Sequence, residues 1–158
     1  ILRYDISNTR DGGINLNEVD LIKRIVSLVL ENHEIGQCEY SSSAISNLLK
    51  MNGVRHNYVC GVMSLDCSSQ LITPHYWIEI DSHQGVLVAD VEIDHWLETY
   101  GLSGVSFLTE LEVQGVRYGD RSCATPIELD VEDIECALSL CSGDLDFVFT
   151  GGVYVETT

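Results

Sequence analysis

Apolar residues recur at helical spacing through the first third of the chain and at strand spacing beyond it, which constrains the order of the elements. Between residues 18 and 32 they recur every three or four positions, so we expect a helix with one buried face. The same spacing over residues 38–51 predicts a second helix, which the stop signal Asn52-Gly53 ends. Segments rich in Val, Ile and Tyr then predict strands over residues 56–65, 75–80 and 86–91.

The turn signal Ser82-His83-Gln84-Gly85 makes a hairpin of the last two of these strands. Residues 1–16 have the pattern of an irregular lead-in. Helices followed by a run of strands, with no repeat or linker between them, predict an α+β fold in one domain, residues 1–158. Later patterns predict a short helix over residues 94–100, a strand over 105–116, a helix over 131–141 and a strand over 147–155.

The charge of the chain limits its partners. Its formal net charge is -17, from 25 acidic and 8 basic residues, and such a surface repels phosphate backbones and anionic lipid head groups. We therefore expect no nucleic-acid binding and no direct membrane contact, whereas a basic protein partner would be attracted. Since the chain starts at Ile1 without a Met, we expect a domain cut from a longer protein, whose missing N-terminal region could direct it to a membrane.

The cysteines predict free thiols. The chain has six, none of them in a CxxC pair, and no set of four metal ligands at close spacing is visible in the sequence. A core of this size needs no disulfides, so we expect reduced thiols and action in the cytosol. We also expect neither a metal nor an organic cofactor.

Cys38 is the candidate nucleophile because it stands at the start of the second predicted helix, two residues after Gly36. Backbone N–H groups at a helix start are unpaired and carry partial positive charge, which stabilises a thiolate. The same groups can donate hydrogen bonds to an oxyanion that forms on an attacked carbonyl. A thiol nucleophile benefits from both effects.

His75 and Asp90 are the candidates for the base and for the group that orients it. His75 opens one strand of the predicted hairpin and Asp90 lies near the end of the other. A hairpin that closes near residue 83 places the two directly opposite each other, with side chains on one face and about 5 Å apart. An imidazole oriented by a carboxylate can hold a thiolate and later protonate a leaving group.

Each of these residues also has a structural interpretation, because a single buried Cys, strand His or turn Asp is common. Among the other histidines, His56 is the strongest rival base. Trp77 either shields the thiolate–imidazolium pair from water or belongs to the core. Small side chains at Ser41 to Ser43 would let a strand approach the start of the helix. For the second oxyanion donor the candidates are the side chains of Gln37 and Asn32, and the backbone N–H of Cys38.

The segments Gly36-Gln37-Cys38, His75-Tyr76-Trp77-Ile78-Glu79 and Val88-Ala89-Asp90 resemble, in this order, the transglutaminase and papain-like superfamily of thiol enzymes. The resemblance implies a papain-like fold, with N-terminal helices that carry the Cys packed on an antiparallel sheet that carries His and Asp. Transglutaminases usually have an aromatic residue after the Cys and a Pro after the Asp. Here Glu39 and Val91 stand there, which argues against cross-linking.

Within that superfamily, the chain is similar to bacterial virulence deamidases, a group that includes type III secreted effectors and a toxin domain. This resemblance covers residues from about 18 to 97. It implies hydrolysis of a glutamine side-chain amide in a host protein, with the α subunit of a heterotrimeric G protein as the implied target. It also implies secretion by a bacterium into the host cell cytoplasm.

Three alternatives stay open on the sequence. A cysteine protease or a transglutaminase could use the same Cys38, His75 and Asp90, because all three reactions pass through an acyl-enzyme. A catalytically silent, acidic protein-binding module would instead leave Cys38 as an unreactive buried thiol.

Overall fold

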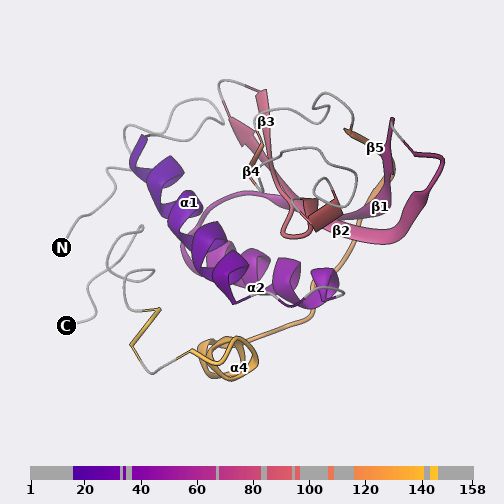
Figure 1. The fold of residues 1–158 in the computed structure, drawn as a ribbon. Helices are drawn as coiled ribbons and strands as arrows, with labels where there is room; N and C mark the ends of the chain where they lie inside the picture. Colours follow the sequence, from indigo (N-terminus) through magenta and orange to yellow (C-terminus); the bar gives the residue numbers. More distant parts are fainter. Residues whose placement is uncertain are drawn as a thin grey trace.

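The computed structural model describes residues 16–32, 34, 37–66, 68–82, 85–93, 95–96, 107–108, 116–140 and 143–145 of the chain. Two helices come first, strands follow, and a short helix comes last (Figure 1). The α+β class is therefore confirmed. The elements are α1 (Leu16–Glu31), α2 (Cys38–Met51), β1 (Asn57–Leu65), β2 (Leu71–Ser82), β3 (Gly85–Ala89), β4 (Phe107–Leu108), β5 (Val116–Cys123) and α4 (Val131–Ala137).

The strands form a five-stranded sheet in the order β4-β3-β2-β1-β5. All neighbouring pairs in it are antiparallel. β1 and β2 are central, and β5 returns from late in the sequence to pair with β1. Figure 1 shows α1 and α2 together on one side of this sheet, with α4 beyond them.

Most of the predicted elements within the described residues are present. α2 has the predicted bounds, whereas β2 begins four residues earlier than predicted, at Leu71, where exposed residues and a proline hide the strand pattern. β5 was not predicted as a strand, because it lies at the sheet edge and only Val116 is buried, so alternation of apolar residues is missing. α4 ends at Ala137 rather than at residue 141, since Ser139 adopts a left-handed backbone conformation. The predictions for residues 1–15 and 147–155, and most of those for 94–100 and 105–116, lie outside the described residues.

Two apolar clusters cover the two faces of the sheet, because successive residues of a strand point to opposite faces. In β2, Ile78 and Ile80 belong to the cluster that α1, α2 and α4 share, whereas Trp77 belongs to the other. β1 divides in the same way between Tyr58 and Val59. The second cluster consists of Val59, Met63, Leu65, Trp77, Val88, Ile93 and Val116.

The serines at the start of α2 lie against the sheet, as the sequence predicted. Ser41, Ser42 and Ser43 are buried. The Ser42 hydroxyl donates a hydrogen bond to the carbonyl of Tyr76 (3.2 Å), and the Ser43 hydroxyl donates to the Tyr58 hydroxyl (3.3 Å). Small side chains allow this approach and their hydroxyls find partners in the sheet, so the first turns of α2 are held against β1 and β2.

The pairing of β1 with β2 is irregular next to His75, where β2 carries one extra residue. Gly61 pairs with His75, and the register then shifts before Met63 pairs with Ile72. The pairing of β1 with β5 is also irregular here, between Cys60 and Val62. Bulges bend a strand and redirect side chains, so this irregularity turns the sheet at the position of the predicted base.

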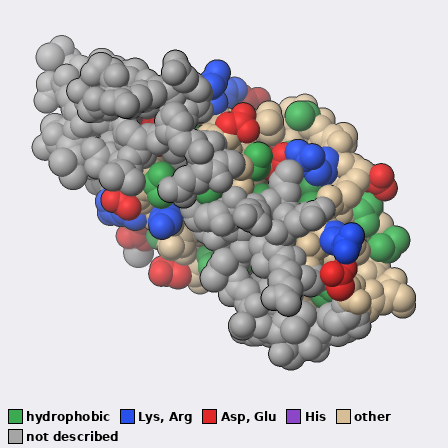
Figure 2. Space-filling model, turned by 90° about the horizontal axis from the view of Figure 1, so that it is seen from above, with side chains coloured by type: hydrophobic (Ala, Val, Ile, Leu, Met, Phe, Trp, Pro, Cys, Tyr) green, Lys and Arg blue, Asp and Glu red, His purple; other side chains and the backbone are tan. Residues whose placement is uncertain are grey.

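The described surface carries both signs of charge despite the strongly acidic composition. Figure 2 shows basic side chains next to acidic ones on the described part of one face. Arg117 on β5, for example, donates to Asp66 at 2.9 Å. Among the described helices, none has the length and apolar composition of a membrane span.

Candidate active site

His75 and Asp90 form a fully buried pair. Nε2 of His75 lies 2.7 Å from Oδ2 of Asp90, and both side chains are 0% exposed. An ionised carboxylate can only accept a hydrogen bond, so Nε2 carries the hydrogen and donates it to Asp90. The predicted partnership of these two residues is present in the structure.

The predicted strand register was wrong, although the side chains meet. Ser82 pairs with Gly85 and Ile78 with Ala89, so continuing this register places Asp90 opposite Trp77 rather than opposite His75. A difference of two residues keeps side chains on the same face, because the side-chain period of a strand is two. His75 and Asp90 are therefore diagonal neighbours, and Asp90 follows directly after the last residue of β3.

Asp90 is held by two further donors. The backbone N–H of Glu92 donates to its Oδ1 at 3.0 Å, and the Tyr118 hydroxyl donates to its Oδ2 at 2.8 Å. Burial by itself would raise the pKa of Asp90. Attraction to His75 and the hydrogen bonds from His75, Glu92 and Tyr118 outweigh it, so the pKa of Asp90 is lowered. Asp90 is thus a carboxylate in the folded protein.

Cys38 is the first residue of α2 and its side chain is half-buried. Its Sγ, a ring nitrogen of His75 and a carboxylate oxygen of Glu92 all lie within 4.8 Å of one another. Nδ1 of His75 is buried and makes no hydrogen bond within the described part of the chain, whereas Nε2 is hydrogen-bonded to Asp90. We therefore assign Nδ1 as the ring nitrogen available to the thiol.

The imidazole favours the charged state. Burial alone is the largest influence and would lower the pKa of His75. The Asp90 carboxylate and the Cys38 sulfur together outweigh it and raise the pKa to about 10. At neutral pH His75 is therefore an imidazolium, the state that stabilises a thiolate at Cys38 and can protonate a leaving group.

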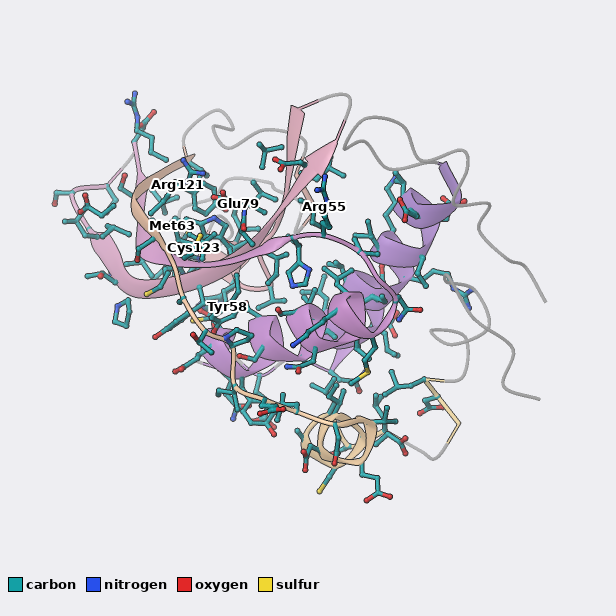
Figure 3. All side chains as sticks on the ribbon, turned by 180° about the vertical axis from the view of Figure 1, so that it is seen from behind. Arg55, Tyr58, Met63, Glu79, Arg121 and Cys123 are labelled. Atoms are coloured by element: carbon teal, nitrogen blue, oxygen red, sulfur yellow. The ribbon has the colours of Figure 1, made fainter. Side chains whose placement is uncertain are left out.

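An aromatic and ionic layer lies beside the imidazole on the same sheet face. The Trp77 ring stacks on His75 with ring centroids 5.8 Å apart, and its indole N–H donates to Glu79 at 2.8 Å. Arg121 reaches from β5 to Glu79 in β2, with Nε at 2.8 Å from Oε2 and Nη2 at 2.5 Å from Oε1 (Figure 3). Trp77 is 0% exposed, so it both belongs to the core and keeps water from one face of His75.

The two amide side chains predicted as oxyanion donors are engaged elsewhere. Asn32 donates to the carbonyl of Leu28 at 2.8 Å, back into α1. Gln37 is the N-cap residue of α2 and donates to Glu34 at 3.3 Å. Gln37 makes no side-chain capping bond, so within the described part of the chain its side chain does not compete with an oxyanion for the first backbone N–H groups of α2, that of Cys38 included.

His56, the alternative candidate for the base, has a structural role. Its Nε2 lies 2.7 Å from the Ser46 hydroxyl and its Nδ1 lies 2.9 Å from the carbonyl of Val54. Both ring nitrogens are thereby occupied by α2 and by the loop before β1. Desolvation by burial, together with nearby Lys50, lowers the pKa of His56 despite the hydrogen bond that its ring donates to the Val54 carbonyl, so it is neutral at neutral pH. His56 lines a groove of about 740 Å³ that includes none of Cys38, His75 and Asp90 among its lining residues.

Sequence reasoning missed two residues that touch this site, Glu92 and Tyr118. Glu92 had a signal, because Asp90-Val91-Glu92 alternates two carboxylates and would place both on one face of an extended segment. Tyr118 had none, since β5 was not predicted and its place beside Asp90 depends on pairing between distant strands. Gly61 was also missed. A Cβ there would lie 2.7 Å from the Trp77 ring, so a glycine is what lets Trp77 pack at this position.

Comparisons of the chain with models of protein families, with curated proteins and with solved structures found no match. The class of the site therefore follows from its own geometry, a helix-start thiol beside an imidazole that a buried carboxylate orients.

Proposed function

We propose that this protein is a cysteine-dependent amidohydrolase that deamidates glutamine in a protein substrate. The observation that carries the proposal is the convergence of three groups: the Cys38 sulfur, the imidazole of His75 within 4.8 Å of it, and Asp90 on the far ring nitrogen at 2.7 Å. A thiol, a base and an orienting acid in this order make up the machinery of acyl transfer.

In the first half-reaction the Cys38 thiolate attacks the side-chain amide carbon of the glutamine. The carbonyl oxygen becomes an oxyanion, which the backbone N–H groups at the start of α2 stabilise. His75 gives its Nδ1 proton to the amide nitrogen, the C–N bond breaks, ammonia leaves and a thioester forms. Asp90 keeps the ring in position, and Nε2 stays bonded to it throughout.

In the second half-reaction the neutral His75 takes a proton from a water molecule through Nδ1. The hydroxide attacks the thioester, the C–S bond breaks, and the product is glutamate with the thiolate restored. The net reaction adds one water and releases one ammonia, so it needs no redox partner. The buried Asp90 carboxylate stabilises the imidazolium each time it forms.

Deamidation rather than proteolysis or cross-linking is the part of the proposal that rests on resemblance to bacterial virulence deamidases. The same resemblance supports a host protein as substrate, with the α subunit of a heterotrimeric G protein as the implied target, and secretion into the host cell cytoplasm. Glu39 and Val91 occupy the two positions where transglutaminases differ, so cross-linking is the weaker alternative.

The test is mass spectrometry of a recombinant G protein α subunit, and of a panel of other glutamine-containing proteins, after treatment with the chain. Deamidation exchanges an amide NH₂ for OH through the acyl-enzyme and raises the mass by about 1 Da without breaking the backbone. The chain should produce this change, and Cys38→Ala should abolish it. Cys123→Ser, which alters an exposed free cysteine, is the matched control and should stay active.

Other outcomes would contradict the proposal in distinct ways. Backbone cleavage would make the protein a protease, and incorporation of an added amine would make it a transglutaminase. Full activity in Cys38→Ala would remove the thiol mechanism altogether. Retention of secondary structure, measured by circular dichroism, separates lost chemistry from lost folding.

A further inference from the structure

Three metal-binding side chains of different kinds meet at one point of the site. They are the sulfur of Cys38, a ring nitrogen of His75 and a carboxylate oxygen of Glu92, all within 4.8 Å of one another. Thiolate, imidazole and carboxylate are the three ligand types that Zn²⁺ takes in proteins. Glu92 has no assigned part in the deamidation steps, and its side chain is buried beside Cys38 and His75.

The ring of His75 is arranged as metal-binding histidines usually are. A histidine ligand generally gives its second ring nitrogen to a carboxylate, which fixes the tautomer and orients the ring. Nε2 of His75 is bonded to Asp90, and Asp90 is held by Tyr118. Nδ1 is buried and, among the described residues, makes no hydrogen bond, so its lone pair in the neutral ring is directed into the site.

We propose that Cys38, His75 and Glu92 form a three-ligand site for Zn²⁺, with the fourth tetrahedral position open. Zinc bonds of about 2.0–2.3 Å at a tetrahedral angle place ligand atoms about 3.5 Å apart. The three atoms, which lie within 4.8 Å of one another, would have to move closer to reach that spacing, and the Cys38 side chain is only half-buried.

Zn²⁺ bound at this site inhibits the reaction of the Cys38 thiol. This consequence rests on the proposed function. The ion takes the place of the proton that Sγ and Nδ1 share, and this proton passes to solvent. No oxidation or reduction is involved. With both atoms bound to the metal, the sulfur cannot attack a carbonyl and the imidazole cannot protonate a leaving group. The inhibition is reversed by a chelator.

Binding is tested with Co²⁺ on the full chain, because Co²⁺ reports both its geometry and thiolate ligation in its absorption spectrum. We expect tetrahedral visible bands and a sulfur-to-cobalt charge-transfer band, both displaced by Zn²⁺. Cys38→Ser should remove the charge-transfer band, whereas Cys123→Ser should retain it. Equal spectra for Cys38→Ser and the unaltered chain would overturn the site.

Glu92→Gln isolates the third ligand, since it keeps the shape of the side chain and removes the charge. We expect it to weaken Zn²⁺ binding about tenfold or more in competition with Co²⁺. Glu132→Gln, which alters an exposed carboxylate in the first turn of α4, is the matched control and should bind as the unaltered chain does. Equal affinities for the two variants would exclude Glu92 as a ligand and overturn the proposal.

Activity measurements keep this proposal distinct from the proposed function. Chelated enzyme that deamidates, and loses activity as Zn²⁺ is added, supports both. Chelated enzyme without activity that still binds Co²⁺ through Cys38 overturns the deamidase and leaves the metal site. Chelated enzyme that deamidates but does not bind Co²⁺ overturns the metal site and leaves the deamidase. Deamidation that requires the metal and is lost on adding a chelator would overturn both the inhibition by Zn²⁺ and the metal-free thiol mechanism of Cys38.

Discussion

Asp90 receives hydrogen bonds from three segments of the chain: from His75 in β2, from the backbone of Glu92 just after it, and from Tyr118 in β5. A buried carboxylate is costly unless its oxygens are satisfied, and here each oxygen has a donor. This residue thereby couples the orientation of the imidazole to the packing of β5.

Tyr118→Phe should destabilise the protein by about 1–3 kcal/mol, because one donor to a buried, charged acceptor is lost while the ring stays. Since this bond also fixes the position of the Asp90 carboxylate, its removal should loosen the orientation of His75 and slow catalysis several-fold. Urea unfolding measures the first effect and deamidation rates the second. Tyr40→Phe, a half-buried tyrosine of α2, is the comparison for stability. Equal losses for the two variants would contradict the role of Tyr118.

Cys38 should react with iodoacetamide at neutral pH faster than Cys60, Cys123 and Cys136, which peptide mass spectrometry can rank. Among these four described thiols, the Cys38 sulfur is the one that lies beside a charged imidazole and at a helix start. Asp90→Asn should slow the reaction of Cys38 and leave the other thiols unchanged, because the imidazolium loses its partner. A Cys38 no faster than exposed Cys123 would favour a catalytically silent binding module.

At the level of elements, the irregular pairing of β1 with β2 and β5 matters, because at Gly61 the backbone of β5 and the Trp77 ring both lie close to β1. A Cβ on Gly61 would lie 2.5 Å from the carbonyl oxygen of Gly119 and 2.7 Å from the Trp77 ring. Neither the strand backbone nor a fully buried ring can move away easily.

Gly61→Ala should therefore destabilise the fold by about 1–3 kcal/mol through overpacking, and it should reduce activity by displacing Trp77 from His75. Gly119→Ala is a closely matched control in the paired strand, because nothing lies within 4 Å of the Cβ it would add. Chemical unfolding of both variants checks the prediction. A Gly61→Ala protein as stable as Gly119→Ala would show that the packing around Gly61 is not tight.

For the molecule as a whole, the buried ion pair predicts how stability changes with pH. The pKa of His75 is raised from 6.5 to about 10, so its stabilisation is complete below pH 6.5 and is lost as the pH rises to 10. The pKa of Asp90 is lowered from 3.8, so its contribution is present above pH 3.8 and is lost as the pH falls below it.

Stability should accordingly decline between pH 7 and pH 10 by an amount on the order of a few kcal/mol more in the unaltered protein than in Asp90→Asn. The comparison between the two proteins removes the contribution of other groups that titrate in this range. Urea unfolding at several pH values measures the difference. If the stabilities of the two proteins changed in parallel with pH, the His75–Asp90 pair would not be the source of this pH dependence.

Local patterns in the sequence were enough to predict α2 and the hairpin turn. Apolar spacing and the Asn52-Gly53 stop define α2, whose bounds agree with the prediction, and Ser82 pairs with Gly85 as the turn signal indicated. The polar run at Ser41 to Ser43 likewise indicated where the helix meets the sheet. These features depend on neighbours in the sequence, so they can be inferred without coordinates.

What the sequence alone determined about this protein is the order of its elements and the likeness of Cys38, His75 and Asp90 to a thiol triad. Only the tertiary structure decided the strand register, the place of Tyr118 on Asp90 and the meeting of Glu92 with Cys38 and His75. The physical reason is that these contacts join segments far apart in the chain. Burial and strand pairing over the whole molecule determine these long-range contacts, and the local spacing of apolar residues does not predict them.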